Sequence, residues 1–167
     1  MDFVFVGKIV NTHGIKGEFR IKSDFEKKDL VFKIGGILYI DKTPYEITSY
    51  RVHKGYDMVT IKDFTNINDV LPFKGKNVFI NRSDLKLSDD DYIYEDLIGC
   101  EVIFENELLG SVVDYTTGAN TLLEVNYNNK IYYIPIKADY ILSVDKDNKK
   151  INVTEETKGL ILWKLVF

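Results

Sequence analysis

Few side chains in this sequence of 167 residues have the chemical types needed for catalysis. Its two histidines are His13 and His53. His13 precedes Lys16 by three residues, so the pair could do acid–base work on RNA, as in a nuclease. A nuclease usually also needs several carboxylates or a metal cluster, and Glu18 alone does not provide one. The sequence therefore predicts no catalytic residue, no metal site and no cofactor, with a nuclease as the enzymatic alternative.

The other motifs for chemistry are equally sparse. There is no glycine-rich phosphate loop of the P-loop or dinucleotide type, and no H-E-x-x-H zinc motif. The single cysteine, Cys100, excludes an internal disulfide and favours a reducing compartment. It starts an apparent strand, where we expect a buried structural thiol.

The loop that carries His13 and Lys16 lies between two predicted strands. Residues 3–10 form a β-branched run, residues 18–22 alternate in polarity, and NTHGIKG stands between them over 11–17. Glycines tolerate positive φ, so Gly14 and Gly17 predict a loop whose tip presents Ile15 to a partner. The alternative is a long hairpin in which the glycines serve only backbone geometry. Arg20 and Lys22 share a strand face, which either extends the basic side of the loop or is simply solvated.

Composition fits a folded protein with packed cores. Apolar residues make up 45% of the chain and aromatic residues 13%. The N-terminus has no basic region of a secretory signal, and no apolar run approaches the ~20 residues that span a bilayer. We expect a soluble, cytoplasmic protein that does not contact membranes.

The net charge of −4 hides an asymmetry between the two halves of the chain. Residues 1–88 hold 15 Lys+Arg against 11 Asp+Glu, a net of +4, and residues 89–167 hold 7 against 15, a net of −8. A basic module suits a structured RNA, whereas an acidic one suits a basic protein and repels nucleic acid. The alternative is chance fluctuation of charge in short segments.

Short strands separated by turn signals dominate the pattern. The first half predicts strands over 3–10, 18–22, 36–40, 45–52, 58–61 and 76–80, and a short helix over 66–74 that Asn66 caps and Pro72 limits. The second half predicts strands over 101–105, 110–115, 121–127, 130–136, 141–144 and 151–153. Asn128-Asn129 is a hairpin turn, and Tyr132 and Tyr133 should point to opposite faces of a strand. The apolar tail over 160–167, with Trp163 as a reporter, either packs on the second barrel or is partly exposed.

The predicted fold is therefore all-β, with two small antiparallel β-barrels joined by a short linker. We place the domains at 1–82 and 91–167, with the polar linker over 83–90, where the charge balance also changes sign.

Two long signatures in the sequence resemble a known family. The run VGKIVNTHGIKGEFRIK over 6–22 is similar to the opening signature of the RimM ribosome maturation factors, G-K-I-x-x-T-H-G-[LI]-K-G-E. The runs DLIG, LGSVVD, TGANTLLEV and YIPI over 96–136, with Gly159-Leu160, resemble the PRC-barrel domain that follows it. The resemblance covers nearly the whole chain, in the right order and spacing.

This resemblance implies a non-catalytic assembly factor, with a translation-factor-like first barrel. It implies binding to the immature small ribosomal subunit through ribosomal protein nineteen of the subunit head, assistance in head assembly and rRNA processing, rRNA as a further partner, and a monomer. The alternative is a general translation-factor-like RNA-binding barrel protein.

The candidate partner-binding residues come from both halves of the chain. They are Thr12, His13, Gly14, Ile15, Lys16, Gly17, Arg20, Tyr92, Ile93 and Tyr94. Relatives often have paired aromatics before D-L-x-G, whereas this chain has one ring in Tyr92-Ile93. Tyr92 and Tyr94 serve either partner contact or internal packing.

Overall fold

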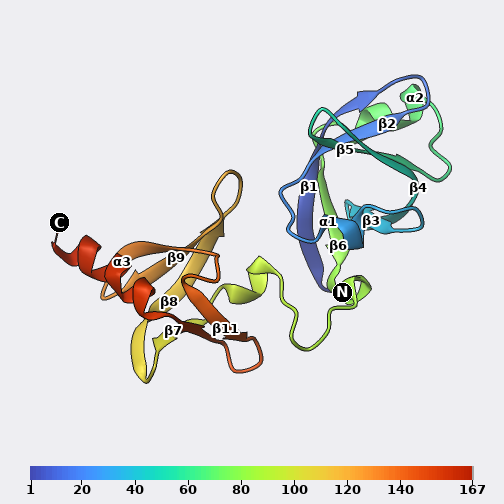
Figure 1. Cartoon of the computed structure of the whole chain (residues 1–167). Helices are drawn as coiled ribbons and strands as arrows, with labels where there is room; N and C mark the ends of the chain where they lie inside the picture. Colours follow the sequence, from blue (N-terminus) through green and yellow to red (C-terminus); the bar gives the residue numbers. More distant parts are fainter. Residues whose placement is uncertain (167) are drawn as a thin grey trace. The chain divides into compact units, whose positions relative to one another are not determined.

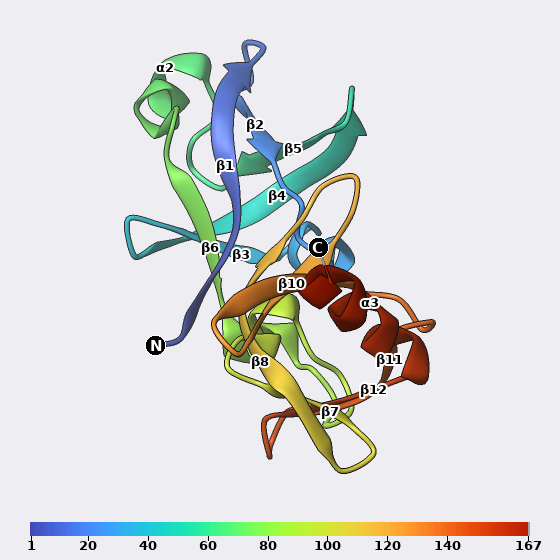
Figure 2. The same ribbon diagram turned by 90° about the vertical axis from the view of Figure 1, so that its left-hand side faces the viewer.

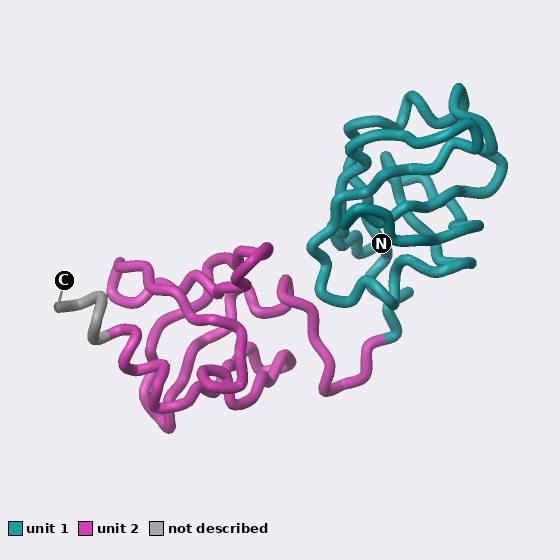
Figure 3. The backbone as a smooth tube through the Cα atoms, turned by 45° about the horizontal axis from the view of Figure 1, so that its top comes forward, with its two compact units in different colours: residues 1–86 teal, residues 87–167 magenta. Residues whose placement is uncertain are grey.

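The computed structural model describes residues 1–166 of the chain, and the side chains of residues 1–161. The chain forms two compact units, residues 1–86 and residues 87–167, each with its own sheet (Figures 1 and 3). The all-β fold class predicted from the sequence is confirmed. Residues 83–85 of the predicted linker belong to a 3-10 turn, η2 (Arg82–Leu85), whose Leu85 is buried.

Unit 1 is a closed barrel with the strand order β1-β2-β5-β4-β3-β6. The strands are β1 (Phe3–His13), β2 (Glu18–Lys22), β3 (Ile37–Ile40), β4 (Thr43–His53), β5 (Tyr56–Ile61) and β6 (Asn77–Asn81). Alternate residues point inward, so Ile9, Phe19, Ile21 and Leu38 are fully buried in its core. Burial of such side chains is the main source of stability for this unit.

Short helical segments join the strands of unit 1. They are α1 (Lys28–Val31), α2 (Ile67–Val70) and η1 (Leu71–Phe73). The Asn66 side chain accepts a hydrogen bond of 3.1 Å from the Asp69 N–H, so it caps α2 as predicted. The helix is short because Pro72 lies in the following 3-10 turn.

One charged group lies inside unit 1. Asp57 is 2% exposed, and its Oδ1 accepts a hydrogen bond of 2.7 Å from the Tyr50 hydroxyl. The Lys28 ammonium lies 2.8 Å from Oδ2 as an ion pair without hydrogen-bond alignment. The pKa of Tyr50 is raised to about 12, mainly by desolvation and further by the hydrogen bond to the Asp57 carboxylate. The two partners make burial of the carboxylate tolerable.

Tyr50→Phe tests this arrangement. The Tyr50 phenol ionises at about pH 12 in the folded chain and near pH 10 in the unfolded chain, so the unfolded state binds fewer protons over this interval and stability falls as pH rises. The variant should be less stable at pH 8 by about 1–2 kcal/mol, and this difference should shrink as pH rises from about 10 to 12. Urea unfolding of both chains over this range measures it. A constant difference at all pH values would contradict the assignment.

Unit 2 contains a sheet with the strand order β10-β9-β8-β7-β12-β11. The strands are β7 (Glu101–Phe104), β8 (Glu107–Thr116), β9 (Leu122–Tyr127), β10 (Lys130–Pro135), β11 (Ile141–Asp145) and β12 (Lys150–Val153), preceded by the turn η3 (Tyr94–Leu97). One pairing departs from the antiparallel prediction, because β12 runs parallel to β7. A parallel neighbour needs a long connection, and β8 to β11 supply it.

Details of unit 2 follow the sequence pattern. Asn128 and Asn129 have φ of 53° and 65°, as a two-residue hairpin turn requires. Tyr132 is 3% exposed and donates a hydrogen bond of 2.8 Å to the Leu109 carbonyl, whereas Tyr133 is 40% exposed. Cys100 is buried, and burial raises the pKa of its thiol. These predictions are confirmed.

The tail forms a helix, α3 (Glu155–Val166), which the sequence analysis missed. The signal was present: Thr154 is followed by Glu155 and Glu156, and acidic residues in a first turn favour a helix. The Thr157 hydroxyl donates a hydrogen bond of 2.8 Å to the Tyr140 carbonyl, and Ile161 is buried in the core of unit 2. The side chains of residues 162–167, Trp163 included, lie outside the described ones.

Candidate nucleic-acid interface

The β1–β2 loop presents two side chains at its tip. Gly14 and Gly17 have φ of 74° and 72°, and the Gly17 N–H donates a hydrogen bond of 3.2 Å to the Gly14 carbonyl. Ile15 and Lys16 occupy the middle of this turn, where Ile15 is 86% exposed and Lys16 is exposed. An apolar and a cationic side chain therefore project together from a rigid strand pair.

The loop is held from behind by α2. The Ile67 N–H donates a hydrogen bond of 3.1 Å to the Ile15 carbonyl. Gly17 is buried, and a Cβ at this position would lie 2.8 Å from the Asn66 carbonyl oxygen, whereas a Cβ at Gly14 meets nothing within 4 Å. Gly17 thus shapes the loop, and its direct contact with a partner stays a prediction.

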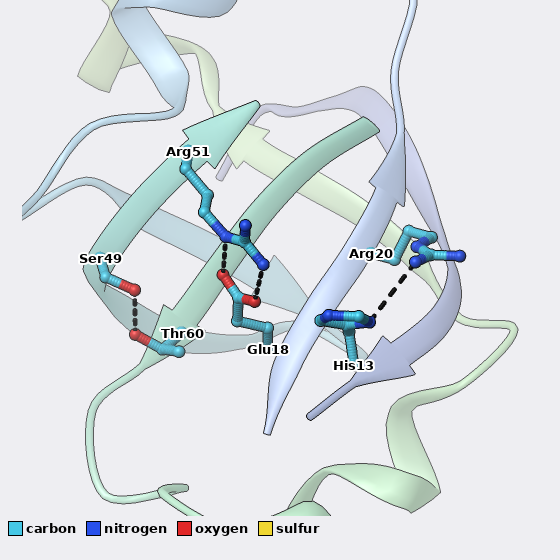
Figure 4. A network of polar contacts seen from close by, with 6 residues as sticks. All are labelled: His13, Glu18, Arg20, Ser49, Arg51 and Thr60. Carbon is cyan, nitrogen blue, oxygen red and sulfur yellow. Dashed lines mark hydrogen bonds and ion pairs between the residues drawn. The ribbon is translucent and has the colours of Figure 1, made fainter. Parts of the chain in front are cut away.

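His13 and Arg20 belong to a polar cluster on the strands next to the loop (Figure 4). The Arg20 Nη2 atom lies 3.5 Å from His13 Nδ1, and its guanidinium lies 5.3 Å from the centre of the Tyr56 ring. The His13 and His53 rings are 5.9 Å apart between centroids. Thr12, the remaining loop candidate, is half-buried in β1. The structure therefore keeps His13 and Arg20 beside the tip.

One ion pair organises this cluster. Arg51 on β4 donates two hydrogen bonds to Glu18 on β2, of 2.9 Å from Nε and 2.7 Å from Nη2 (Figure 4). The bidentate contact lowers the pKa of Glu18, so this carboxylate stays ionised. The pKa of His53 is lowered, mainly by desolvation and further by the positive charges of Arg51 and Lys54. The cluster holds two guanidinium groups against one carboxylate, which favours an approaching anion.

Arg51, His53 and Tyr56 were not among the predicted site residues. They lie more than thirty positions from the loop in sequence, and strand pairing brings them near it. β5 pairs with β2 through Arg20↔Met58, and with β4 through Arg51↔Met58. The His53-Lys54-Gly55 turn was visible in the sequence, but the register that places it beside β2 was not.

The candidate residues of unit 2 lie in or just before the turn η3. Tyr92 and Tyr94 are half-buried and pack against the core of this unit, and the Tyr94 ring meets the Tyr115 ring at 5.9 Å. Desolvation raises the pKa of Tyr92. Ile93 is 0% exposed, and its N–H is hydrogen-bonded to Asp96 Oδ2 at 3.1 Å. Its side chain is therefore turned inward, and its role as a partner contact stays a prediction.

In the described part of the chain, the histidine, cysteine and carboxylate side chains form no group of three or more that could hold a metal ion. None of the helices in this part is long and apolar enough to cross a membrane.

Comparison with known proteins gives consistent matches along the chain. The RimM N-terminal domain family matches residues 4–85, and the RimM PRC barrel domain family matches residues 94–157. Two proteins named ribosome maturation factor RimM, from Staphylococcus aureus strains bovine RF122 / ET3-1 and JH9, are 40% identical over 159 residues, which is 90% of this chain and 95% of theirs. A crystal structure of a putative 16S ribosomal RNA processing protein RimM from Pseudomonas aeruginosa is 24% identical, with a TM-score of 0.46 over 94% of this chain and 99% of that one.

Proposed function

The chain belongs to the RimM family of ribosome maturation factors, and from this premise we propose that it is a non-catalytic, cytoplasmic assembly factor that binds the immature small ribosomal subunit. In this proposal it acts as a monomer on the subunit head, where it assists head assembly and processing of the small-subunit rRNA.

Residues of the β1–β2 loop provide the main structural support for this proposal. An exposed Ile15 and Lys16 on a braced turn form a recognition surface, and the neighbouring Arg20 and Arg51 add positive charge. Phosphate oxygens are natural partners for such groups, so we assign this end of unit 1 to rRNA. The Glu18–Arg51 ion pair holds the guanidinium in place.

Unit 2 suits a different partner. Residues 89–167 carry a net charge of −8, which repels RNA and attracts a basic ribosomal protein, and we assign to it the head protein nineteen. Tyr92 and Tyr94 remain the proposed aromatic contacts, since both keep part of their surface exposed.

Co-sedimentation with ribosomal fractions from growing cells tests this function. We expect enrichment with immature small subunits and absence from translating ribosomes. Purified head protein nineteen should bind the full chain, with association slowing as salt screens the acidic unit over ~8 Å at physiological ionic strength. An even distribution over all ribosomal fractions would point instead to a general RNA-binding barrel, and cleavage of rRNA by the purified chain would point to a nuclease.

A further inference from the structure

The outer face of the unit 1 barrel carries aromatic rings that the barrel core does not use. Phe3 alternates with the buried Val4 on β1, so its ring points outward. Phe79 on β6 is the cross-strand partner of both Phe5 on β1 and Tyr39 on β3. Figure 2 shows these three neighbouring strands at one side of the barrel. Four rings thus form one continuous row across β3, β6 and β1.

The rings contact each other and leave a hollow above them. Phe3 lies 5.1 Å from Tyr39 and 6.5 Å from Phe79 between ring centroids, and Phe5 lies 5.8 Å from Phe79. A groove of about 520 Å³ is lined by the rings of Phe3, Tyr39 and Phe79. Phe5 is not among the lining residues, but its ring contacts that of Phe79 and it is 54% exposed. The groove therefore offers apolar ring surface to a flat, stackable group.

The rim of this aromatic groove is mainly cationic. The two-residue turn between β3 and β4 holds Asp41 and Lys42 at φ of 51° and 66°, which places an exposed Lys42 at the groove. Lys76 lines the groove and forms an ion pair with Asp41, so the rim carboxylate is already neutralised. Lys8 is exposed and lies opposite Asn77, another residue of the rim. Lysines thus flank the rings.

We propose that the aromatic groove binds a single-stranded segment of RNA, with unpaired bases on Phe3, Tyr39 and Phe79 and phosphates at Lys42 and Lys8. Aromatic rings flanked by cations are how proteins hold single strands, because every base has a face to stack. Protein interfaces also combine aromatic cores with polar rims, so failure to bind single-stranded RNA would point to a protein partner instead. This inference rests on the proposed function in one respect, which is that the RNA would be an unpaired segment of rRNA.

Fluorescence anisotropy of the full chain with a labelled oligouridylate of about 10 nucleotides tests this proposal. Tyr39→Ala should weaken binding roughly 5- to 100-fold, because stacking on one ring is lost, while Tyr39→Phe should keep the affinity. Lys42→Ala should weaken binding and reduce its salt dependence by about one phosphate contact. Ile34→Ala removes an apolar side chain outside the groove that is 74% exposed, and it should change nothing. A duplex RNA of the same length should not compete, because its bases are already stacked.

Several results would overturn the groove. One is failure of the natural chain to bind the oligouridylate, and another is competition by the duplex for the site. Binding by Tyr39→Ala or Lys42→Ala with the affinity of the natural chain would overturn it as well. Thermal unfolding of each variant shows whether a loss reflects folding, and the surface substitution Lys42→Ala keeps the test decisive if Tyr39→Ala unfolds. If the chain co-sediments with immature small subunits but does not bind oligouridylate, the groove is not an RNA site and the proposed function is unaffected. If it binds oligouridylate but not the subunits, the groove is supported and the proposed function is contradicted.

Discussion

A chain carrying Ile15→Ala and Lys16→Ala together should bind immature small subunits roughly 10- to 30-fold more weakly than the natural chain. Both side chains lie at the tip of the β1–β2 loop, and Ile15 is 86% exposed, so they are free for a partner. Loss of an anchoring pair at an interface centre costs about 1.4–2 kcal/mol of binding. Their removal should leave the free energy of unfolding within about 0.5 kcal/mol of its natural value, because exposed side chains contribute little to folding. Quantitative co-sedimentation measures the affinity.

Unit 1 supplies a matched control for this pair. Lys33 and Ile34 are also adjacent and exposed, with Ile34 at 74%. Lys33→Ala with Ile34→Ala removes the same two side-chain types from another place and should leave subunit binding intact. Equal affinity of the Ile15/Lys16 variant and this control would remove the loop from the binding site. His13 is a poorer target, because its ring contacts Arg20 and His53 and its loss would disturb the polar cluster.

Gly17→Val should destabilise unit 1 by about 2–5 kcal/mol. A non-glycine residue at the left-handed φ of 72° costs about 1–2 kcal/mol, and the added Cβ would lie 2.8 Å from the Asn66 carbonyl oxygen and 3.1 Å from Val70 Cγ2. Overpacking of this kind adds roughly 1–3 kcal/mol. Urea unfolding followed by circular dichroism measures the change.

Gly14→Val separates the two causes. Gly14 has nearly the same φ, 74°, but a Cβ there meets no atom within 4 Å. This variant should lose only the conformational part, about 1–2 kcal/mol. Equal stability losses at the two glycines would show that contact with Asn66 and Val70 plays no part. The Gly17 variant should also weaken subunit binding, because displacing α2 disturbs the hydrogen bond from Ile67 to the Ile15 carbonyl.

Local patterns in the sequence were sufficient for the features that depend on neighbouring residues. Alternation predicted the strands of both sheets, Asn66 the helix cap, and Asn128-Asn129 the hairpin turn. The positive φ of Gly14 and Gly17 and the exposed tip between them were equally readable. These follow from φ/ψ preferences and from which side of a strand is apolar, and both are properties of short segments.

Tertiary structure decided everything that depends on strand register and on packing between distant segments. The register between β2, β5 and β4 brings Arg51 to Glu18 across 33 positions. The row of four aromatic rings exists because β6 lies between β1 and β3 in the closed barrel. Packing buries Ile93, and closeness to the Asn66 carbonyl gives Gly17 a steric role besides its turn geometry. A shift of one residue in strand pairing would turn Arg51 and the row of rings to the opposite face, so no single segment contains the information.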